Sequence, residues 1–303
     1  MKRRTLLKSA LALPLMGPSA NTAMASATSA VTKRGPDAIY SGLPGLDYAL
    51  GGIPPCELSC VTGPPCMGKT LLLLDLAARI AARYGRNVVF YSAHQPSVYL
   101  SRKLATRGGT EITFAGVRDS VSQFGQAIGS SASIFLFDSR SEDEPRALEF
   151  ACTLVSEHPG GCAAVIMDGW STYQPPLVNK QLVYKDGTFP AERWSNGLLS
   201  IQTLNNVKRF GANFGIPVVI GVTTVSLMDA EAQAQSFEVE SELRVRADRL
   251  LTLRRPEIYR ETAQMKPEER NVVCLTGTSP RWWDTRCSRL RFDPRRLGFS
   301  TVV

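Results

Sequence analysis

The chain has 303 residues with a formal net charge of +8 at pH 7, and its 44% hydrophobic residues are enough to bury a substantial core. Six basic residues precede the first acidic residue, Asp37, so the chain beyond them carries a charge of only about +2, and the basic pI does not by itself indicate a nucleic-acid partner. No stretch approaches about 18 uninterrupted apolar residues, so we expect no integral membrane segment.

Residues 1–36 are predicted to be a leader outside the folded domain, either signal-like or disordered. The leader contains KRRTLLK, a short apolar run over residues 11–16, and an Ala-Met-Ala sequence at residues 23–25 that fits a signal peptidase site. This order resembles a twin-arginine export signal. A mitochondrial presequence, a disordered tail and a start codon placed too early remain open as alternatives.

The most informative motif is GPPCMGKT at residues 63–70, which has the spacing of a phosphate-binding P-loop. Its Gly-rich turn can point backbone N–H groups at phosphate oxygens, Lys69 can reach the β- and γ-phosphates, and the Thr70 hydroxyl can ligate Mg²⁺. A predicted strand over 57–62 precedes the loop and a predicted helix over 70–83 follows it, so the helix dipole also favours an anion. The residues predicted to contact ATP are Gly63, Pro64, Pro65, Cys66, Met67, Gly68, Lys69 and Thr70.

Seven cysteines, an odd number, occur without paired C-x-x-C spacing, which predicts neither a zinc site nor a complete disulfide framework and favours a reducing compartment. Cys66 lies inside the 63–70 loop, and Cys56 and Cys60 lie just before it. These cysteines are either small residues that pack a tight turn or a redox-sensitive element of the loop.

One α/β domain is predicted over residues 37–303, because continuous apolar runs alternate with helical patterns. After the loop, we expect strands over 87–92, 133–138, 163–168, 217–223, 249–253 and 271–275. Besides the helix after the loop, we expect helices over 46–50, 100–105, 144–157 and 199–214. This alternation predicts a mainly parallel sheet with helices on both faces, and the strand over 163–168 ends in an acid, Asp168.

Three segments interrupt or follow this pattern. The polar stretches 174–196 and 226–244 each follow the carboxyl end of a strand, so they are either functional loops or ordinary solvated insertions. The last stretch suits single-stranded nucleic acid or, alternatively, an edge hairpin with a solvated basic face. Its arginine and aromatic residues are Arg281, Trp282, Trp283, Arg286, Arg289, Arg291, Phe292, Arg295 and Arg296.

The order of these motifs resembles the RecA-like ATPase domain of hexameric replicative helicases of the DnaB type. The resemblance rests on SGLPGLDYALGGI, on PPCMGKT, on EPRALEFACTLVSEHPGGCAAVIMDGW, and on NVKRFGANFGIPVVIGVTT followed by ADRLLTLRR. It runs colinearly from about Asp37 to Ser300. Circadian-clock and recombinase ATPases share the same order of elements, so the P-loop is its most specific part.

Three positions depart from the family pattern. The glutamate that activates the attacking water is replaced by His94, which cannot supply a fixed negative charge beside Mg²⁺. The glutamine sensor falls on Thr224, and the trans-acting arginine falls on Thr278, with Arg281 as a possible substitute nearby. The sequence therefore supports nucleotide binding better than nucleotide hydrolysis.

The resemblance implies a cytoplasmic ATPase or helicase that uses ATP and Mg²⁺ and acts on DNA in replication or in a mobile element. It assigns catalytic positions to Lys69, Asp168 and His94, and Mg²⁺ ligands to Thr70 and Asp168. It also implies single-stranded DNA as a partner and a homo-oligomer, a hexamer in the family. The alternative is a non-hydrolysing nucleotide-binding protein with an accessory or regulatory role.

Overall fold

The computed structural model describes residues 38–93, 95–106, 111–113, 125–128, 132–138, 161–171, 201–224, 241, 243–259, 265–266, 269–280 and 285–302. The chain divides into two units, Met1–Arg34 and Gly35–Val303, and every described residue lies in the second. The leader, the helix expected over 144–157 and the polar stretch 174–196 lie outside the described residues. None of the described helices is long and apolar enough to cross a membrane.

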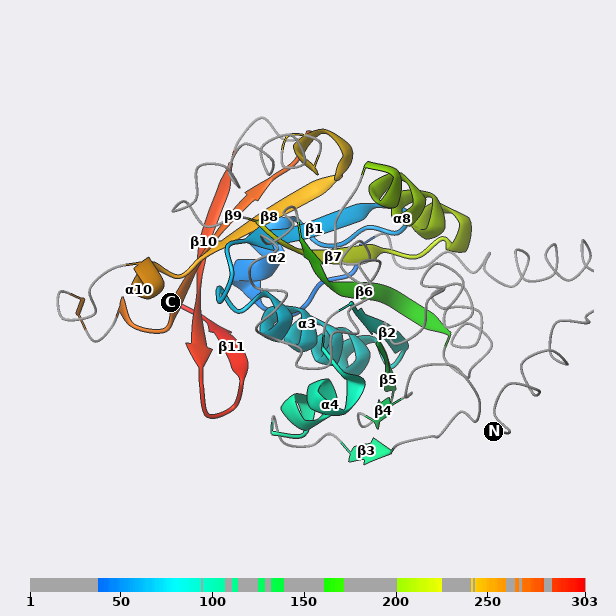
Figure 1. Ribbon diagram of the computed structural model, residues 1–303, viewed down its shortest axis with the longest axis horizontal. Helices are drawn as coiled ribbons and strands as arrows, with labels where there is room; N and C mark the ends of the chain where they lie inside the picture. Colours follow the sequence, from blue (N-terminus) through cyan, green and yellow to red (C-terminus); the bar gives the residue numbers. More distant parts are fainter. Residues whose placement is uncertain are drawn as a thin grey trace, which may run out of the picture. The chain divides into compact units, whose positions relative to one another are not determined.

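The described strands form one sheet in the order β11-β10-β9-β8-β1-β7-β6-β2-β5-β4-β3 (Figure 1). The central strands are parallel, namely β8 (Arg249–Arg254), β1 (Leu58–Gly63), β7 (Val218–Thr223), β6 (Cys162–Ser171), β2 (Asn87–Ser92) and β5 (Ser133–Asp138). Antiparallel strands flank them on both sides, namely β9 (Val272–Thr278), β10 (Arg286–Asp293), β11 (Gly298–Thr301), β4 (Gly125–Ile128) and β3 (Glu111–Thr113). The predicted mainly parallel sheet is confirmed at its centre, where all strands end at one edge.

Helices pack on both faces of this sheet, as the sequence predicts. Their bounds are α2 (Pro44–Leu50), α3 (Lys69–Tyr84), α4 (Ser97–Ala105), α8 (Ile201–Phe214) and α10 (Pro256–Tyr259). One apolar core lies between the sheet and α2, α3 and α4, with Leu73 of α3 fully buried. The other core includes Leu204, Val207 and Phe210, which repeat at helical spacing on α8.

The predicted series of strands included β9 but none of the other antiparallel strands of the sheet. Beyond 271–275 the structure adds the hairpin of β10 and β11, and between β2 and β5 it adds β3 and β4. These strands are short or alternate charged with apolar residues, so they lack the continuous apolar run that marks a strand buried on both faces. The edge hairpin expected as one interpretation of the carboxyl-terminal stretch is observed in β10 and β11, and its contact with nucleic acid stays a prediction.

Strands β8 to β11 form the carboxyl-terminal wing of the sheet, and α2 lies against its inner face. The approach is close enough to require a glycine in β9, because a Cβ atom at Gly277 would lie 1.9 Å from the carbonyl oxygen of Ala49. Arg249 secures the same contact: its Nη1 donates to the Gly51 carbonyl oxygen at 2.8 Å, and its Nε donates to Glu57 Oε2 at 3.0 Å. The wing is therefore fixed to the amino-terminal part of the domain.

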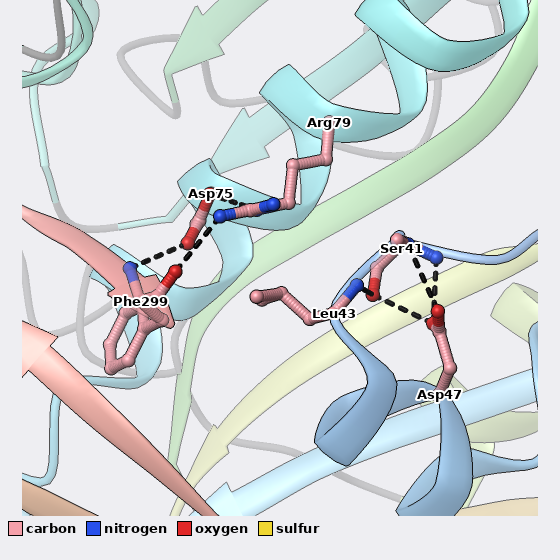
Figure 2. A network of polar contacts seen from close by, with 7 residues as sticks. Ser41, Leu43, Asp47, Asp75, Arg79 and Phe299 are labelled. Carbon is pink, nitrogen blue, oxygen red and sulfur yellow. Dashed lines mark hydrogen bonds and ion pairs between the residues drawn. The ribbon is translucent and has the colours of Figure 1, made fainter. Parts of the chain in front are cut away.

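A buried carboxylate ties β11 to α3, the helix that follows the 63–70 loop (Figure 2). Asp75 is fully buried; its Oδ1 accepts from Arg79 Nε at 2.8 Å and its Oδ2 accepts from the Phe299 backbone N–H at 2.9 Å. Arg79 Nη2 in turn donates to the Phe299 carbonyl oxygen at 2.8 Å. Both polar groups of the Phe299 backbone are thus held by one ion pair.

Figure 2 shows a second carboxylate that performs a local task near the start of α2. Asp47 Oδ1 accepts from both the backbone N–H and the hydroxyl of Ser41, each at 2.7 Å, and Oδ2 accepts from the Gly42 N–H at 2.9 Å. Leu43, at the N-cap position of α2, offers no side-chain acceptor. Asp47, which lies inside the helix, stabilises the turn before α2 in its place.

We expect the substitution Asp75→Ala to lower the free energy of unfolding by about 2–3 kcal/mol, since it removes charge-assisted hydrogen bonds and leaves the buried Phe299 N–H without an acceptor. Urea denaturation followed by circular dichroism measures the loss. The exposed α4 residue Arg102 provides the control, because Arg102→Ala should change the stability by less than about 0.5 kcal/mol. Equal stability of the two variants would contradict the assigned role of Asp75.

Candidate functional site

The 63–70 loop connects the carboxyl end of β1 to the first residue of α3. Gly68 occupies the N-cap position with φ of 90°, a left-handed conformation that glycine adopts without strain. Because the first N–H groups of a helix have no carbonyl partner within it, those at the start of α3 can bind an anion. The fully buried side chain of Met67 anchors the loop in the core, whereas Pro65 and Cys66 are exposed.

Lys69 is held over this loop by the loop's own carbonyl groups. Its Nζ donates to the carbonyl oxygen of Gly63 at 2.8 Å and to that of Pro64 at 2.7 Å. An ammonium group has three donors, so one remains for a phosphate oxygen. Burial lowers the pKa of Lys69 to about 8, and the nearby Asp168 and Cys66 oppose this effect to a smaller extent.

Thr70 and Asp168 meet although they are 98 residues apart in the sequence. The Thr70 hydroxyl donates to Asp168 Oδ2 at 2.7 Å, and Asp168 is only 3% exposed. Both belong to the predicted Mg²⁺ site, and the structure brings them together. A hydroxyl and a carboxylate are oxygen ligands of the kind that Mg²⁺ prefers, and Mg²⁺ commonly keeps several waters, so two protein oxygens suit it.

Asp168 is placed by an irregularity in β6 that the sequence analysis did not foresee. The predicted strand stopped at Asp168, but the observed strand continues to Ser171, and its register against β7 shifts between Met167 and Trp170. Asp168 and Gly169, the latter with φ of 97°, thus form a β-bulge opposite Gly221. Such bulges re-aim a side chain within a strand, here toward Thr70.

Gly221 leaves the space that the carboxylate of Asp168 occupies. A Cβ atom at Gly221 would lie 2.7 Å from Asp168 Oδ1 and 2.5 Å from Leu73 Cδ1. Gly221 is not among the predicted site residues, although the glycine within the apolar run VVIGVT was a signal, since glycine in a strand often marks a bulge or a close approach.

His94 lies outside the described residues, but the chain on both sides of it is fixed near Asp168. The backbone N–H of Ala93 donates to the Asp168 carbonyl oxygen at 2.8 Å, and the Gln95 N–H donates to the Ser92 hydroxyl at 2.9 Å. A second buried acid at this edge, Asp138, accepts from the Ser97 N–H at 2.8 Å and so holds the start of α4.

Thr224 and Thr278 occupy two of the positions where the chain departs from the family pattern, and their surroundings differ. Thr224 follows β7 and is buried, and its backbone N–H donates to the Gly63 carbonyl oxygen at 3.1 Å, so it lies at the base of the loop. Thr278 pairs with Leu250 at the amino end of β8, the end of the sheet opposite to the 63–70 loop. Thr278 is therefore not part of this chain's own candidate site.

Arg255 is a second cation beside the loop that the sequence analysis did not single out. It follows β8, its backbone N–H donates to the Met67 sulfur at 3.2 Å, and its guanidinium lies 5.4 Å from the ring centroid of Phe292. It forms an ion pair with Glu257, while its buried Nε has no hydrogen-bond partner among the described residues. In the sequence, Arg255 could have been identified from its place in the pair Arg254-Arg255. This pair ends the apolar run of β8 at the edge where parallel sheets bind ligands.

Comparisons with known proteins identify the fold. Two of the solved structures that share it are the following. One, described as an ATPase domain, has a TM-score of 0.59 and 15% identity and covers 95% of this chain and 100% of its own. The other, a DnaB-like replicative helicase studied with its interactions with primase, has a TM-score of 0.60 and 15% identity and covers 96% of this chain and 68% of its own. The fold is therefore that of RecA-like ATPase domains.

Part of the sequence also matches a family model. Residues 38–143 match the family model of the DnaB-like helicase C terminal domain, which confirms the resemblance to DnaB-type helicases over the part of the chain that contains the 63–70 loop. A comparison with curated proteins gave no match.

We expect Gly221→Ala to weaken Mg²⁺-dependent ATP binding by about 10- to 100-fold, the range typical when groups that orient a metal ligand are disturbed, because the new methyl group displaces the carboxylate of Asp168. Calorimetric titration with and without Mg²⁺ measures the effect. Gly211→Ala is the matched control, since its Cβ would lie 2.8 Å from Val218 Cγ2, away from the loop. Both variants should lose about 1–3 kcal/mol of stability from overpacking. Unchanged Mg²⁺-dependent binding by Gly221→Ala would refute the role given to Gly221.

The lowered pKa of Lys69 predicts how ATP affinity depends on pH. A bound phosphate favours charged Lys69, so ATP binding takes up a proton above pH 8 and the affinity falls as the pH rises, by at most about tenfold per pH unit. Titrations between pH 7 and pH 9.5 should show constant affinity below pH 8 and a decline above it. Lys69→Arg, which stays charged over this range, should lack the decline. The same decline in both proteins would assign it to another group.

Proposed function

We propose that this chain binds ATP with Mg²⁺ at the 63–70 loop and acts as a DnaB-like ATPase on single-stranded DNA. The observation that carries the proposal is the hydrogen bond between Thr70 and Asp168, which joins the start of α3 to the bulge in β6. It places a hydroxyl and a buried carboxylate beside a lysine that has one donor free.

Each residue has a definite task in this proposal. Lys69 and the first N–H groups of α3 bind the phosphate oxygens, and the carbonyl groups of Gly63 and Pro64 keep the ammonium group in position. Thr70 and Asp168 hold Mg²⁺. When bound, Mg²⁺ neutralises negative charge on the phosphates.

Position 94 is proposed to face the attacking water. The hydrogen bond from Ala93 to Asp168 supports this, because it keeps the preceding residue beside the proposed Mg²⁺ ligand. A histidine there can accept a proton but supplies no fixed negative charge, so we expect slow hydrolysis.

Action on DNA and assembly into a ring are proposed from the resemblance to DnaB-type helicases. Lys180, Lys185, Arg193 and Trp194 lie in the stretch 174–196, where the resemblance places a DNA-binding loop. Thr278, where the resemblance places the trans-acting arginine, lies away from this chain's own loop, which agrees with a position that acts on the nucleotide of a second copy.

A non-hydrolysing nucleotide-binding protein is the second candidate function. It is favoured by Thr224 at the base of the loop, where a threonine reaches less far than the family's glutamine. It is favoured also by Thr278, which offers no positive charge to a neighbouring site.

The test is ATP turnover of the full chain with and without single-stranded DNA, compared with that of His94→Glu. We expect the variant to hydrolyse ATP about 10²- to 10⁴-fold faster, because a carboxylate can orient and polarise the attacking water. The control is Lys69→Ala, which should abolish ATP binding. Normal ATP binding with unchanged, DNA-independent turnover in His94→Glu would favour the non-hydrolysing function, and equal ATP affinity in Lys69→Ala would refute the nucleotide site.

A further inference from the structure

The outer face of the carboxyl-terminal wing carries three exposed arginines that belong neither to the core nor to the candidate nucleotide site. Along β10 the residues alternate, so that Leu290 and Phe292 are buried against the inner face while Arg289 and Arg291 are exposed on the outer face. Arg254, the last residue of β8, is also exposed.

The strand register brings these arginines together. Arg289 of β10 pairs with Cys274 of β9, and Cys274 pairs with Arg254 of β8, so the two arginines share one row across the sheet. Their Cα atoms are therefore about 10 Å apart, and Arg289 and Arg291 are about 7 Å apart along β10. The three guanidinium groups, named here the arginine face, lie on one side of the sheet.

No described carboxylate forms an ion pair with the arginine face. The guanidinium groups of Arg254, Arg289 and Arg291 form no ion pair or hydrogen bond with the described residues. The nearest acid along β10, Asp293, accepts the backbone N–H groups of Arg295 and Arg296 in the hairpin turn at 2.9 and 3.3 Å. The face thus concentrates positive charge on a chain whose net charge beyond the leader is only about +2.

We infer that the arginine face binds the phosphate backbone of single-stranded nucleic acid. Guanidinium groups bind phosphate oxygens through paired hydrogen bonds, and their spacing suits phosphates along an extended strand. Cys274 lies between Arg254 and Arg289 in their row, and the neighbouring row carries the small side chains of Thr252 and Thr276. No exposed large apolar side chain of the described residues lies in β8 to β11, so the face lacks the anchors that an acidic protein partner would use.

This inference rests on the proposed action on single-stranded DNA and locates a contact outside the stretch 174–196. Because the contacts reach phosphates and no bases, the face is expected to bind strands of any sequence. Arg254 also adjoins Arg255, whose backbone contacts the 63–70 loop, so a bound strand would lie near the nucleotide.

The test compares two triple variants of the full chain. The first is Arg254→Ala, Arg289→Ala and Arg291→Ala. The second is Arg83→Ala, Arg102→Ala and Arg209→Ala, which removes three exposed arginines from helices and the same total charge. Fluorescence anisotropy with dT20 and with rU20 is measured over a salt series, and calorimetry with MgATP verifies that each variant is folded.

We expect the first variant to bind both strands on the order of 10²-fold more weakly at about 0.1 M salt. Because three phosphate contacts disappear, the slope of log affinity against log salt concentration should become shallower by about 2. The control variant should keep the slope. Equal losses in both variants, or competition by polyglutamate as strong as by dT20, would overturn the inference.

Two further outcomes separate this inference from the proposed function. Binding of dT20 that survives in the first variant but is lost in Lys180→Ala with Lys185→Ala would overturn the arginine face and leave the proposed function intact. If the wild-type protein binds neither dT20 nor rU20, both the arginine face and the proposed action on single-stranded DNA are overturned.

Discussion

The hydrogen bond between Thr70 and Asp168 is the constraint on which the candidate site depends. It fixes the start of α3 against β6 and therefore sets the positions proposed for the nucleotide, the metal ion and the attacking water. Two neighbouring features support the geometry of this hydrogen bond. The bulge in β6 directs the carboxylate of Asp168 toward Thr70, and Gly221, which has no side chain, leaves room for that carboxylate. A buried acid is tolerable here because Thr70 satisfies one of its oxygens and Lys69 supplies a nearby positive charge.

Much of this arrangement could be predicted from the sequence because its signals are local. The spacing of GPPCMGKT, the apolar runs of β1, β2, β5, β6 and β7, and the helical pattern of α3 each lie within a few residues. Parallel strands end at one edge of a sheet, so the convergence of Lys69, Thr70 and Asp168 followed from the order of elements.

The features that escaped prediction depend on pairing between distant segments. The bulge at Asp168 is defined only by its register against β7, and Arg255 approaches the loop only because β8 pairs with β1. The alternation of arginine with Leu290 and Phe292 was visible in the sequence, but only the pairing of β9 with β8 and β10 shows that Arg254 shares a row with Arg289. Local patterns thus identified the loop and Asp168 but missed Gly221 and Arg255.

The buried carboxylate of Asp75 has a consequence for how this protein is made. Its partner, the backbone of Phe299, is 224 residues later in the chain. While a ribosome is still synthesising the chain, the helix that follows the nucleotide loop therefore carries a negative charge whose final hydrogen-bond donor does not yet exist. Arg79 of the same helix can pair with Asp75 as soon as α3 forms, but the contact between α3 and β11 forms only after Phe299 has been added to the chain.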